Sequence, residues 1–576
     1  MKNLAVYIHY SHKNGLKEYE KYFLAALLIH YEVHLVSNSE LDIKSIDWLT
    51  QKNISFLVRD NAGYDFGAYK DFFKNYGNKV KDYDNVLLVN NSFYGPIGNL
   101  EPPQTLLSNK DFFGWYLHPR TGCIKEHLQS FFLLFGPNII KTNALTNFFL
   151  SLKYPITFED AIDIETSLTE YFRSKGFLIK YKSGFRETGQ LFDNPSMLLP
   201  DKLLASGVPL LKRKYFSLSY HYFLENSYGH HSASALRAAE KQGYPLNLIY
   251  DDLLDHQQSL TFPLLHHFYI LDKDRTHIES DCKKIALIIF VYYEDLIEQN
   301  RKIIDRFLQL EAKVLIVSPK SEILELYQKN FSVGCEYSLM QNRGRNEFAY
   351  FNCGSELLKK YDYTCLLHDK KSGLEYPAIR GYDWSEYCLD NLVPSSEYIQ
   401  NVIEVFERNP KIGLLFPPPP LFSKWRNIPN TVWANPNNLT WAKKLFELFE
   451  LDVPFDTHPL VPYGAMFWVR KSALAPLVNQ KLPIDFFPEE PLAADGTVLH
   501  ALERIYTLIA QNEKFYSGWI MNKQSAEQYL INLYYELCDK VPTKPVAPGI
   551  KESARMLFSA IKKRLNREYL RLCKKN

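Results

Sequence analysis

Two polar residues and a glycine stand where the chain leaves an apolar run, in the stretch NAGYDFGAY at residues 61–69. Asn61 and Asp65 follow the strand-like segment ISFLVRD, and Gly63 lies between them. Glycine lets the backbone turn tightly or approach a ligand closely. An aspartate in such a place can contact a sugar hydroxyl or a metal ion. Asn and Gly also mark ordinary loops, so a plain turn stays open as the alternative.

The same pattern recurs in the second half of the chain, about 280 residues later. There the stretch QNRGRNEFAY at 341–350 matches DNAGYDFGAY, and the strand-like YDYTCLLHDKKS at 361–372 matches YDNVLLVNNS at 83–92. The paired residues are Asn342, Gly344 and Asn346 with Asn61, Gly63 and Asp65, and His368 and Asp369 with Asn90 and Asn91. This ordered recurrence predicts a tandem repeat, in which the loop at 61–69 is a recurrent structural feature of the fold.

Strand-like and helix-like segments alternate along both halves, which predicts α/β units with a mainly parallel sheet. Ligands of such sheets bind at the carboxyl ends of the strands, where the polar residues fall. We therefore expect two Rossmann-like units at 1–200 and 283–545. A helical bridge is expected at 201–282 and a basic amphipathic helix at 546–576.

Bulk composition narrows the classes of protein. A chain of 576 residues requires more than one domain. A net charge of +2 gives no support to nucleic-acid binding. The eight cysteines form no CxxC pair, and no apolar stretch is long enough to span a membrane. These features predict a reduced, cytoplasmic protein.

Further motifs carry a resemblance to a known family. In the second half they are YGAMFWVRKSALAPL, DFFPEE and DGTVLHALERIY, and in the first RDNAGYDFGAY, NNSFYGPI, HLQSFFLLF and IETSLTEYFRSKGF. Together they resemble the rhamnan synthesis protein F family over about residues 4–545. The resemblance implies two GT-A-like glycosyltransferase units and inverting L-rhamnosyl transfer. The implied donor is dTDP-L-rhamnose, and the implied acceptor is a lipid-linked saccharide of a cell wall or capsule.

Such a transfer needs a carboxylate that takes the acceptor's proton and positive groups or a metal near the leaving diphosphate. The resemblance implies Asp495 as the base in unit two, with Glu489 and Glu490 as nearby candidates, and Glu165 in the same place in unit one. Asp495 as a helix cap stays open. Arg504 can clamp a diphosphate or form a structural salt bridge.

The remaining expected contacts divide between donor and acceptor. Donor contacts are expected from Asn61, Gly63, Asp65, Asn91, Asn342, Gly344, Asn346, His368, Asp369, Lys371 and Arg504. Acceptor contacts are expected from His127, Gln129, Trp468 and His500, with a buried structural His127 as the alternative. Asp369 is the candidate ligand for Mg²⁺ or Mn²⁺, and metal dependence is left open because Asn90 and Asn91 carry no charge.

The C-terminal stretch 550–576 carries nine Lys and Arg against two Glu, with apolar residues at helical spacing. Such a helix can lie on the anionic inner face of the plasma membrane or dock on its own domain. Two other functions stay open for the whole chain. One or both units could only bind polysaccharide as a scaffold, or the enzyme could be a teichoic-acid-type transferase with another donor.

Overall fold

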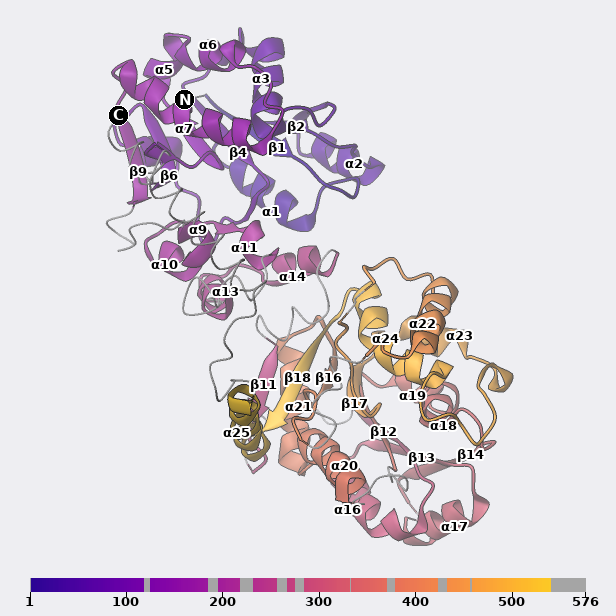
Figure 1. The fold of residues 1–576 in the computed structure, drawn as a ribbon. Helices are drawn as coiled ribbons and strands as arrows, with labels where there is room; N and C mark the ends of the chain where they lie inside the picture. The colour runs from indigo at the N-terminus through magenta and orange to yellow at the C-terminus, as the bar shows by residue number, and fades with distance from the viewer. Residues whose placement is uncertain are drawn as a thin grey trace, which may run out of the picture. The chain divides into compact units, whose positions relative to one another are not determined.

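The computed structural model describes residues 2–118, 125–184, 195–217, 232–255, 267–274, 284–331, 333–369, 379–422, 432–455 and 458–539. The chain divides into two compact units (Figure 1). The boundary lies between Asp252 and Leu253. Lys371 and the predicted helix at 546–576 lie outside the described residues.

The first unit is an α/β unit with one large sheet. Its strands are β1 (Asn3–His9), β2 (Glu32–Ser37), β3 (Ser55–Val58), β4 (Asn85–Asn90), β5 (Phe93–Tyr94), β6 (Phe112–His118), β7 (His127–Leu128), β8 (Phe132–Phe135), β9 (Ile179–Gly184) and β10 (Leu211–Lys212). Its helices are α1 (Glu18–Leu27), α2 (Ile43–Gln51), α3 (Tyr64–Tyr76), α4 (Pro103–Leu107), α5 (Pro137–Lys141), α6 (Ala144–Ser151), α7 (Phe158–Ser174), α9 (Pro195–Leu198), α10 (Pro200–Ala205), α11 (Arg213–Ser217), α13 (Ser232–Lys241) and α14 (Asn247–Leu254).

The second unit is built in the same way. Its strands are β11 (Phe268–Leu271), β12 (Ile285–Phe290), β13 (Lys313–Ser318), β14 (Cys335–Leu339), β15 (Tyr363–His368), β16 (Ile412–Phe416), β17 (Phe467–Arg470) and β18 (Tyr516–Asn522). Its helices are α16 (Ile297–Gln309), α17 (Ser321–Asn330), α18 (Arg345–Phe348), the π-helix η4 (Ala349–Cys353), α19 (Ser355–Lys360), α20 (Ile379–Leu392), α21 (Ser396–Arg408), α22 (Pro436–Leu448), α23 (Ala475–Gln480), α24 (Val498–Asn512) and α25 (Lys523–Asp539).

The two large sheets have the same strand order. In the first, β3-β2-β1-β4 are parallel, β8 is antiparallel to β4, and β6 continues beside β8 and pairs in parallel with β9. In the second, β14-β13-β12-β15 are parallel, β17 is antiparallel to β15, and β16 continues beside β17 and pairs in parallel with β18. The helices α7 and α24 therefore hold equivalent places, each leading into the last of these strands.

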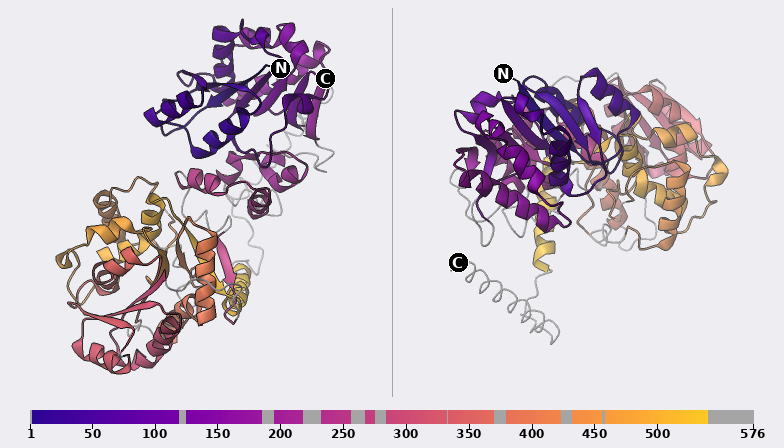
Figure 2. Two further views of the ribbon diagram at one scale, coloured as in Figure 1. Left: turned by 180° about the vertical axis from the view of Figure 1, so that it is seen from behind. Right: turned by 90° about the horizontal axis from the view of Figure 1, so that it is seen from above.

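Helices cover both faces of each sheet, because the central strands are apolar on both sides (Figure 2). In the first unit, Tyr7 and Leu87 pack with α1 and α2, while their neighbours Val6 and Leu88 pack with α3, α6 and α7. In the second unit, η4, α19, α22 and α24 pack on one face. Each sheet is thus a rigid platform that presents the carboxyl ends of its parallel strands.

The segment predicted as a separate bridge is divided between the two units. Strand β10 pairs with β5, and both Tyr94 and Arg213 donate hydrogen bonds to Asp252 within the first unit. Strand β11 pairs with β18 in the second unit. These hydrogen bonds attach β10, Arg213 and Asp252 to the first unit and β11 to the second. In the described part of the chain, no helix combines the length and apolar character needed to cross a membrane.

Candidate active site

A cavity of about 1020 Å³ opens in the second unit at the carboxyl ends of β12 and β15, whose last residues Phe290 and His368 line it. Residues from α18, α24 and the loop before α24 complete the wall. The predicted site residues that line this cavity are Asn342, Asn346, His368, Asp369, Glu490, Asp495, His500 and Arg504. Predicted site residues that come from separate sequence motifs therefore line the same cavity.

The repeated glycine loop has the same geometry in both units. Gly344 and Gly63 precede α18 and α3 with φ of +78° in each case, a left-handed conformation that favours glycine. The turn directs the first helical turn of α18, with Asn346 and Glu347, toward the cavity. The predicted role of the glycines in shaping the loop agrees with this backbone.

Glu347 is a buried carboxyl that the sequence analysis did not select. It is 4% exposed and lines the cavity. Burial raises the pKa of Glu347 to about 8, and the nearby charge of Glu503 adds to the rise while Arg345 opposes it. A carboxyl in such a place is protonated at neutral pH.

Glu503 and Asp495 both lie beside Arg504. The backbone N–H of Gly464 donates a 2.6 Å hydrogen bond to Glu503, and Arg504 Nη1 lies 3.8 Å from the same carboxylate. Arg504 Nη2 donates to Asp495 over 3.3 Å, and Asn438 donates to Asp495 over 2.9 Å. Burial disfavours the Asp495 carboxylate, but the bond from Asn438 and the charge of Arg504 outweigh it and lower its pKa. Asp495 is therefore an ionised, partnered carboxylate, and its role as base stays a prediction.

The two glutamates upstream of Asp495 differ in their surroundings. Glu490 accepts two hydrogen bonds from Arg345, of 2.7 and 2.9 Å, and lines the cavity with it. The bond from Arg345 lowers the pKa of Glu490. Glu489 has an 82% exposed side chain, lies 3.5 Å from Arg343 and does not line the cavity. Glu489 is therefore wrongly placed for chemistry in this cavity.

Asp369 lines the cavity but uses both of its oxygens on the protein itself. Oδ2 accepts from the backbone N–H groups of Tyr292 and Tyr293, at 2.8 and 3.0 Å, and Oδ1 accepts from Asn300 at 2.6 Å. Burial raises the pKa of Asp369 against these three bonds. Within the described ranges, no cluster of three or more His, Cys, Asp or Glu could hold a metal ion. Asp369 does not fit a Mg²⁺ or Mn²⁺ site here.

Three further predictions for unit two have different outcomes. His368 and His500 line the cavity, and burial lowers the pKa of His500. Trp468 does not, so its expected contact with an acceptor is wrong. Its side chain is fully buried in β17, its indole N–H donates to the carbonyl of Leu392, and its ring stacks on Phe307. The alternation of β17 turns this tryptophan into the core.

In unit one, Asp65 lies beside Asn90 and near Glu165. Asn90 Nδ2 donates a 2.7 Å hydrogen bond to Asp65. Burial raises the pKa of Asp65 to about 6, and the charge of Glu165 adds to the rise. Glu165 accepts two 2.6 Å hydrogen bonds from the backbone N–H and the hydroxyl of Ser130. Two predicted site residues, Asp65 and Glu165, are thus brought together.

The other predicted site residues of unit one do not all lie beside Asp65 and Glu165. Asn91 donates instead to the Tyr10 carbonyl and to the buried Glu20, at 2.9 and 3.0 Å. His127 is buried, and its Nε2 lies 4.0 Å from Glu165. Gln129 is also buried, and Asn61 is exposed. The burial of His127 favours the structural alternative.

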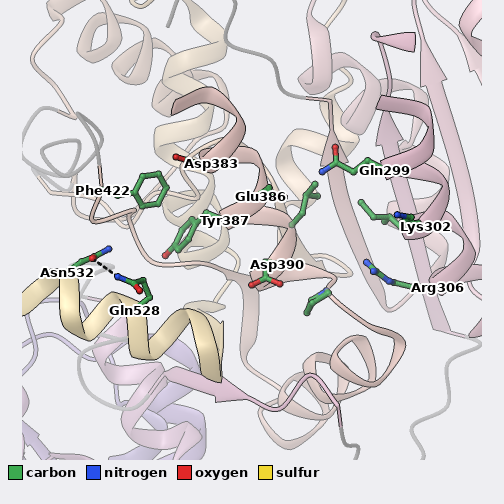
Figure 3. Close-up of a pocket in the computed structure, with 13 residues that line it drawn as sticks. Gln299, Lys302, Arg306, Asp383, Glu386, Tyr387, Asp390, Phe422, Gln528 and Asn532 are labelled. Atoms are coloured by element: carbon green, nitrogen blue, oxygen red, sulfur yellow. Dashed lines mark hydrogen bonds between the residues drawn. The ribbon is translucent and has the colours of Figure 1, made fainter. Parts of the chain in front are cut away.

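A second cavity of unit two, about 720 Å³ in volume, lies between α16, α20 and α25 (Figure 3). Lys302 and Arg306 come from α16, and Asp383, Glu386 and Asp390 come from α20. None of the predicted site residues lines it. The larger cavity is therefore the candidate active site.

Comparison with known proteins identifies the family. The family model described as rhamnan synthesis protein F matches residues 33–515, which include both glycine loops and α24. The chain belongs to the rhamnan synthesis protein F family. The resemblance seen in the sequence motifs is confirmed.

Curated relatives of this family member match over shorter regions. Protein WxcX of Xanthomonas campestris pv. campestris strain B100 is 25% identical over 228 residues, 39% of this chain and 31% of its own length. Virulence protein VirA of Vibrio anguillarum strain ATCC 68554 / 775 is 36% identical over 129 residues, 21% of this chain and 40% of its own length. The matched region thus spans less than half of either relative.

Among solved structures, the glycosyltransferase GlyE of Streptococcus pneumoniae TIGR4 aligns with 71% of this chain and 99% of its own. The sequence identity is 11% and the TM-score is 0.22. A score this low does not establish a shared fold, so the family match and the geometry of the cavity carry the functional argument.

Proposed function

We propose that the protein is a glycosyltransferase that moves an L-rhamnosyl group from dTDP-L-rhamnose to a lipid-linked, rhamnose-containing polysaccharide. The observation that carries this proposal is the cavity of unit two, where carboxyl groups and guanidinium groups from separate elements face one space of about 1020 Å³. Membership in the rhamnan synthesis protein F family supports rhamnose as the transferred sugar.

The side chains of the cavity match the charges that develop during sugar transfer. Negative charge grows on the departing diphosphate, and Arg345 and Arg504 are the cationic groups able to receive it. The acceptor hydroxyl loses a proton as its oxygen attacks the sugar carbon, which requires a nearby carboxylate. Asp495 holds Arg504 in place through their 3.3 Å ion pair. No step is assigned to a metal ion, because Asp369 does not fit one.

Both units are proposed to be of the GT-A type, so that the protein makes two linkages. The common strand order of the two sheets and their matching glycine loops support this proposal. In unit one, Asp65 follows the glycine loop, and Glu165 lies on α7, which has the same place in the fold as α24 of unit two. The competing proposal is that unit one only binds polysaccharide. Measuring nucleotide-sugar turnover distinguishes a catalytic unit one from a binding one.

The acceptor suggests where the protein works. A lipid-linked saccharide is presented at a membrane surface, and the sequence of 550–576 carries nine basic residues against two acidic ones. We place the protein at the inner face of the plasma membrane, bound peripherally.

The test is a transfer assay with the full chain, a panel of nucleotide sugars and a lipid-linked rhamnose-containing acceptor. Product formation from dTDP-L-rhamnose, with release of dTDP, is expected. Arg504→Gln is expected to lower the rate at least tenfold, while Lys302→Gln, which changes the second cavity, serves as the matched control. Transfer from a different nucleotide sugar would show that the donor sugar is not rhamnose. Binding of polysaccharide without turnover of any donor would show that the chain is a scaffold and not an enzyme.

A further inference from the structure

Each unit brings a carboxyl from its glycine loop close to a carboxyl from the helix that leads into the last parallel strand. In unit two these are Glu347 of α18 and Glu503 of α24, and in unit one they are Asp65 of α3 and Glu165 of α7. Glu347 and Glu503 both line the cavity of unit two, and the charge of Glu503 adds to the rise that burial causes in the pKa of Glu347, as the charge of Glu165 does for Asp65. The sequence repeat aligned Glu165 with Asp495, whereas the structure pairs Glu165 with Glu503.

The helix carboxyl is anchored in the same manner in both units. Glu503 accepts a 2.6 Å hydrogen bond from the backbone N–H of Gly464, just before β17. Glu165 accepts a 2.6 Å hydrogen bond from the backbone N–H of Ser130, just before β8. Since β17 and β8 hold equivalent places in their sheets, the anchor fixes both carboxylates relative to the same strand end.

Buried polar groups with unused hydrogen-bonding capacity surround Glu347. Among the described residues, the hydroxyls of Tyr350 and Tyr506 are buried without a hydrogen-bond partner. Both tyrosines interact electrostatically with Glu347. In unit one, the Tyr69 hydroxyl has the same status beside Asp65. Buried polar groups of this kind are available to hydrogen-bond a bound water or ligand.

We infer that, in the transfer proposed above, Glu503 accepts the proton of the acceptor hydroxyl while Glu347 stays protonated beside it, so that the pair carries a single negative charge. The acceptor O–H bond breaks as its oxygen bonds to the anomeric carbon of the sugar. The bond from that carbon to the diphosphate oxygen breaks in the same step, and the diphosphate leaves with the electron pair. Glu503 then returns its proton to water. This inference rests on the proposed function.

The two carboxyl groups divide these roles because their surroundings differ. The Glu503 side chain is 19% exposed, and Arg504 Nη1 lies 3.8 Å from its carboxyl group. Glu347 is 4% exposed, and of the charged groups around it Glu503 opposes its ionisation while Arg345 favours it. Its pKa of about 8 keeps it neutral at physiological pH. Above that pH, a second negative charge in the cavity repels the diphosphate.

The test measures initial transfer rates of the full chain from about pH 6 to about pH 9 for Glu503→Gln, Glu347→Gln and the control Glu513→Gln at the end of α24. Glu503→Gln is expected to lower the rate of the linkage made by unit two by about 10²–10⁴-fold at every pH. Glu347→Gln is expected to lower the rate less than about tenfold at neutral pH and to remove its decline above about pH 8. The control is expected to keep the wild-type profile. Wild-type transfer by Glu503→Gln, or a loss in Glu347→Gln equal to that of Glu503→Gln, overturns the inference.

Infrared spectra of the ligand-free protein test the protonation of Glu347 without any turnover. A band of a protonated carboxyl at neutral pH, absent in Glu347→Gln, is expected. An unchanged spectrum overturns the inference even when the wild-type enzyme is active. A wild-type enzyme that transfers no sugar, while this band is present, refutes the proposed function instead.

Discussion

Asn300 donates a 2.6 Å hydrogen bond to Asp369 in the second unit, and the first unit contains the same pair with the chemical groups exchanged. There Asn91, at the strand end, donates over 3.0 Å to Glu20 on the helix. The acid thus stands on the strand end in one unit and on the first helix in the other. Unit one therefore has an amide, Asn91, at the strand end, and the carboxylate at that edge of the sheet comes from Glu20.

The exchange predicts that Asp369→Asn destabilises unit two and that adding Asn300→Asp restores part of the lost stability. In the single variant two amide donors face each other, at a cost of about 1–3 kcal/mol in the free energy of unfolding. In the double variant, the new carboxylate on α16 accepts from the new amide at the strand end, as Glu20 does from Asn91. Thermal unfolding of the wild type, both single variants and the double variant measures the coupling. Strictly additive losses would show that the two positions do not interact.

Because the Glu347 carboxyl is buried, we expect the folded protein to lose stability as the pH rises. Its pKa of about 8 lies above the ordinary value of 4.5, so the folded protein binds the proton more tightly than the unfolded chain. The stabilisation is complete below about pH 4.5 and is lost as pH rises toward about 8. Glu347→Gln cannot ionise, so its free energy of unfolding is expected to exceed that of the wild type by a few kcal/mol above about pH 8. Denaturant unfolding of both proteins across this range checks the sign, and parallel curves would contradict the buried, protonated state.

The glycine loop predicts a difference between two glycines of unit one with similar backbone angles. Gly63 has φ of +78°, and a Cβ there would lie 3.0 Å from the ring of Tyr154. Gly176 has φ of +83° and open space around it. Both alanine variants bear the left-handed strain of about 1–2 kcal/mol, but Gly63→Ala is expected to lose more stability because of the contact. Equal shifts of the unfolding temperature would show that the loop adjusts freely.

The sequence predicted the polar strand ends and the glycine loops because both depend on local rules of chain direction and backbone conformation. Asp495, His500 and Arg504 were found together because they belong to one helix and its preceding loop. Glu347 and Glu503 were missed, since neither stands out in an apolar stretch, and only the fold brings residues of α18 and α24 to the same cavity.

Trp468 was misjudged for a related reason. An aromatic residue near a site suggests a sugar-stacking surface, but β17 pairs with β15 and β16 on both edges and lies under helices on both faces. Its alternation buries Trp468 against Phe307. Which face a central strand residue takes depends on long-range pairing, and the motif alone does not contain that information.

Calorimetric titration of the full chain with dTDP-L-rhamnose tests whether the cavity of unit two binds the nucleotide-sugar donor. Arg345 lines the cavity and Arg343, two residues before it, does not, so Arg345→Gln and Arg343→Gln form a matched pair. Loss of one charge-assisted contact to the diphosphate is expected to weaken binding about 10–100-fold in Arg345→Gln, with wild-type affinity in Arg343→Gln. Equal affinity in all three proteins would place the donor elsewhere and contradict the account.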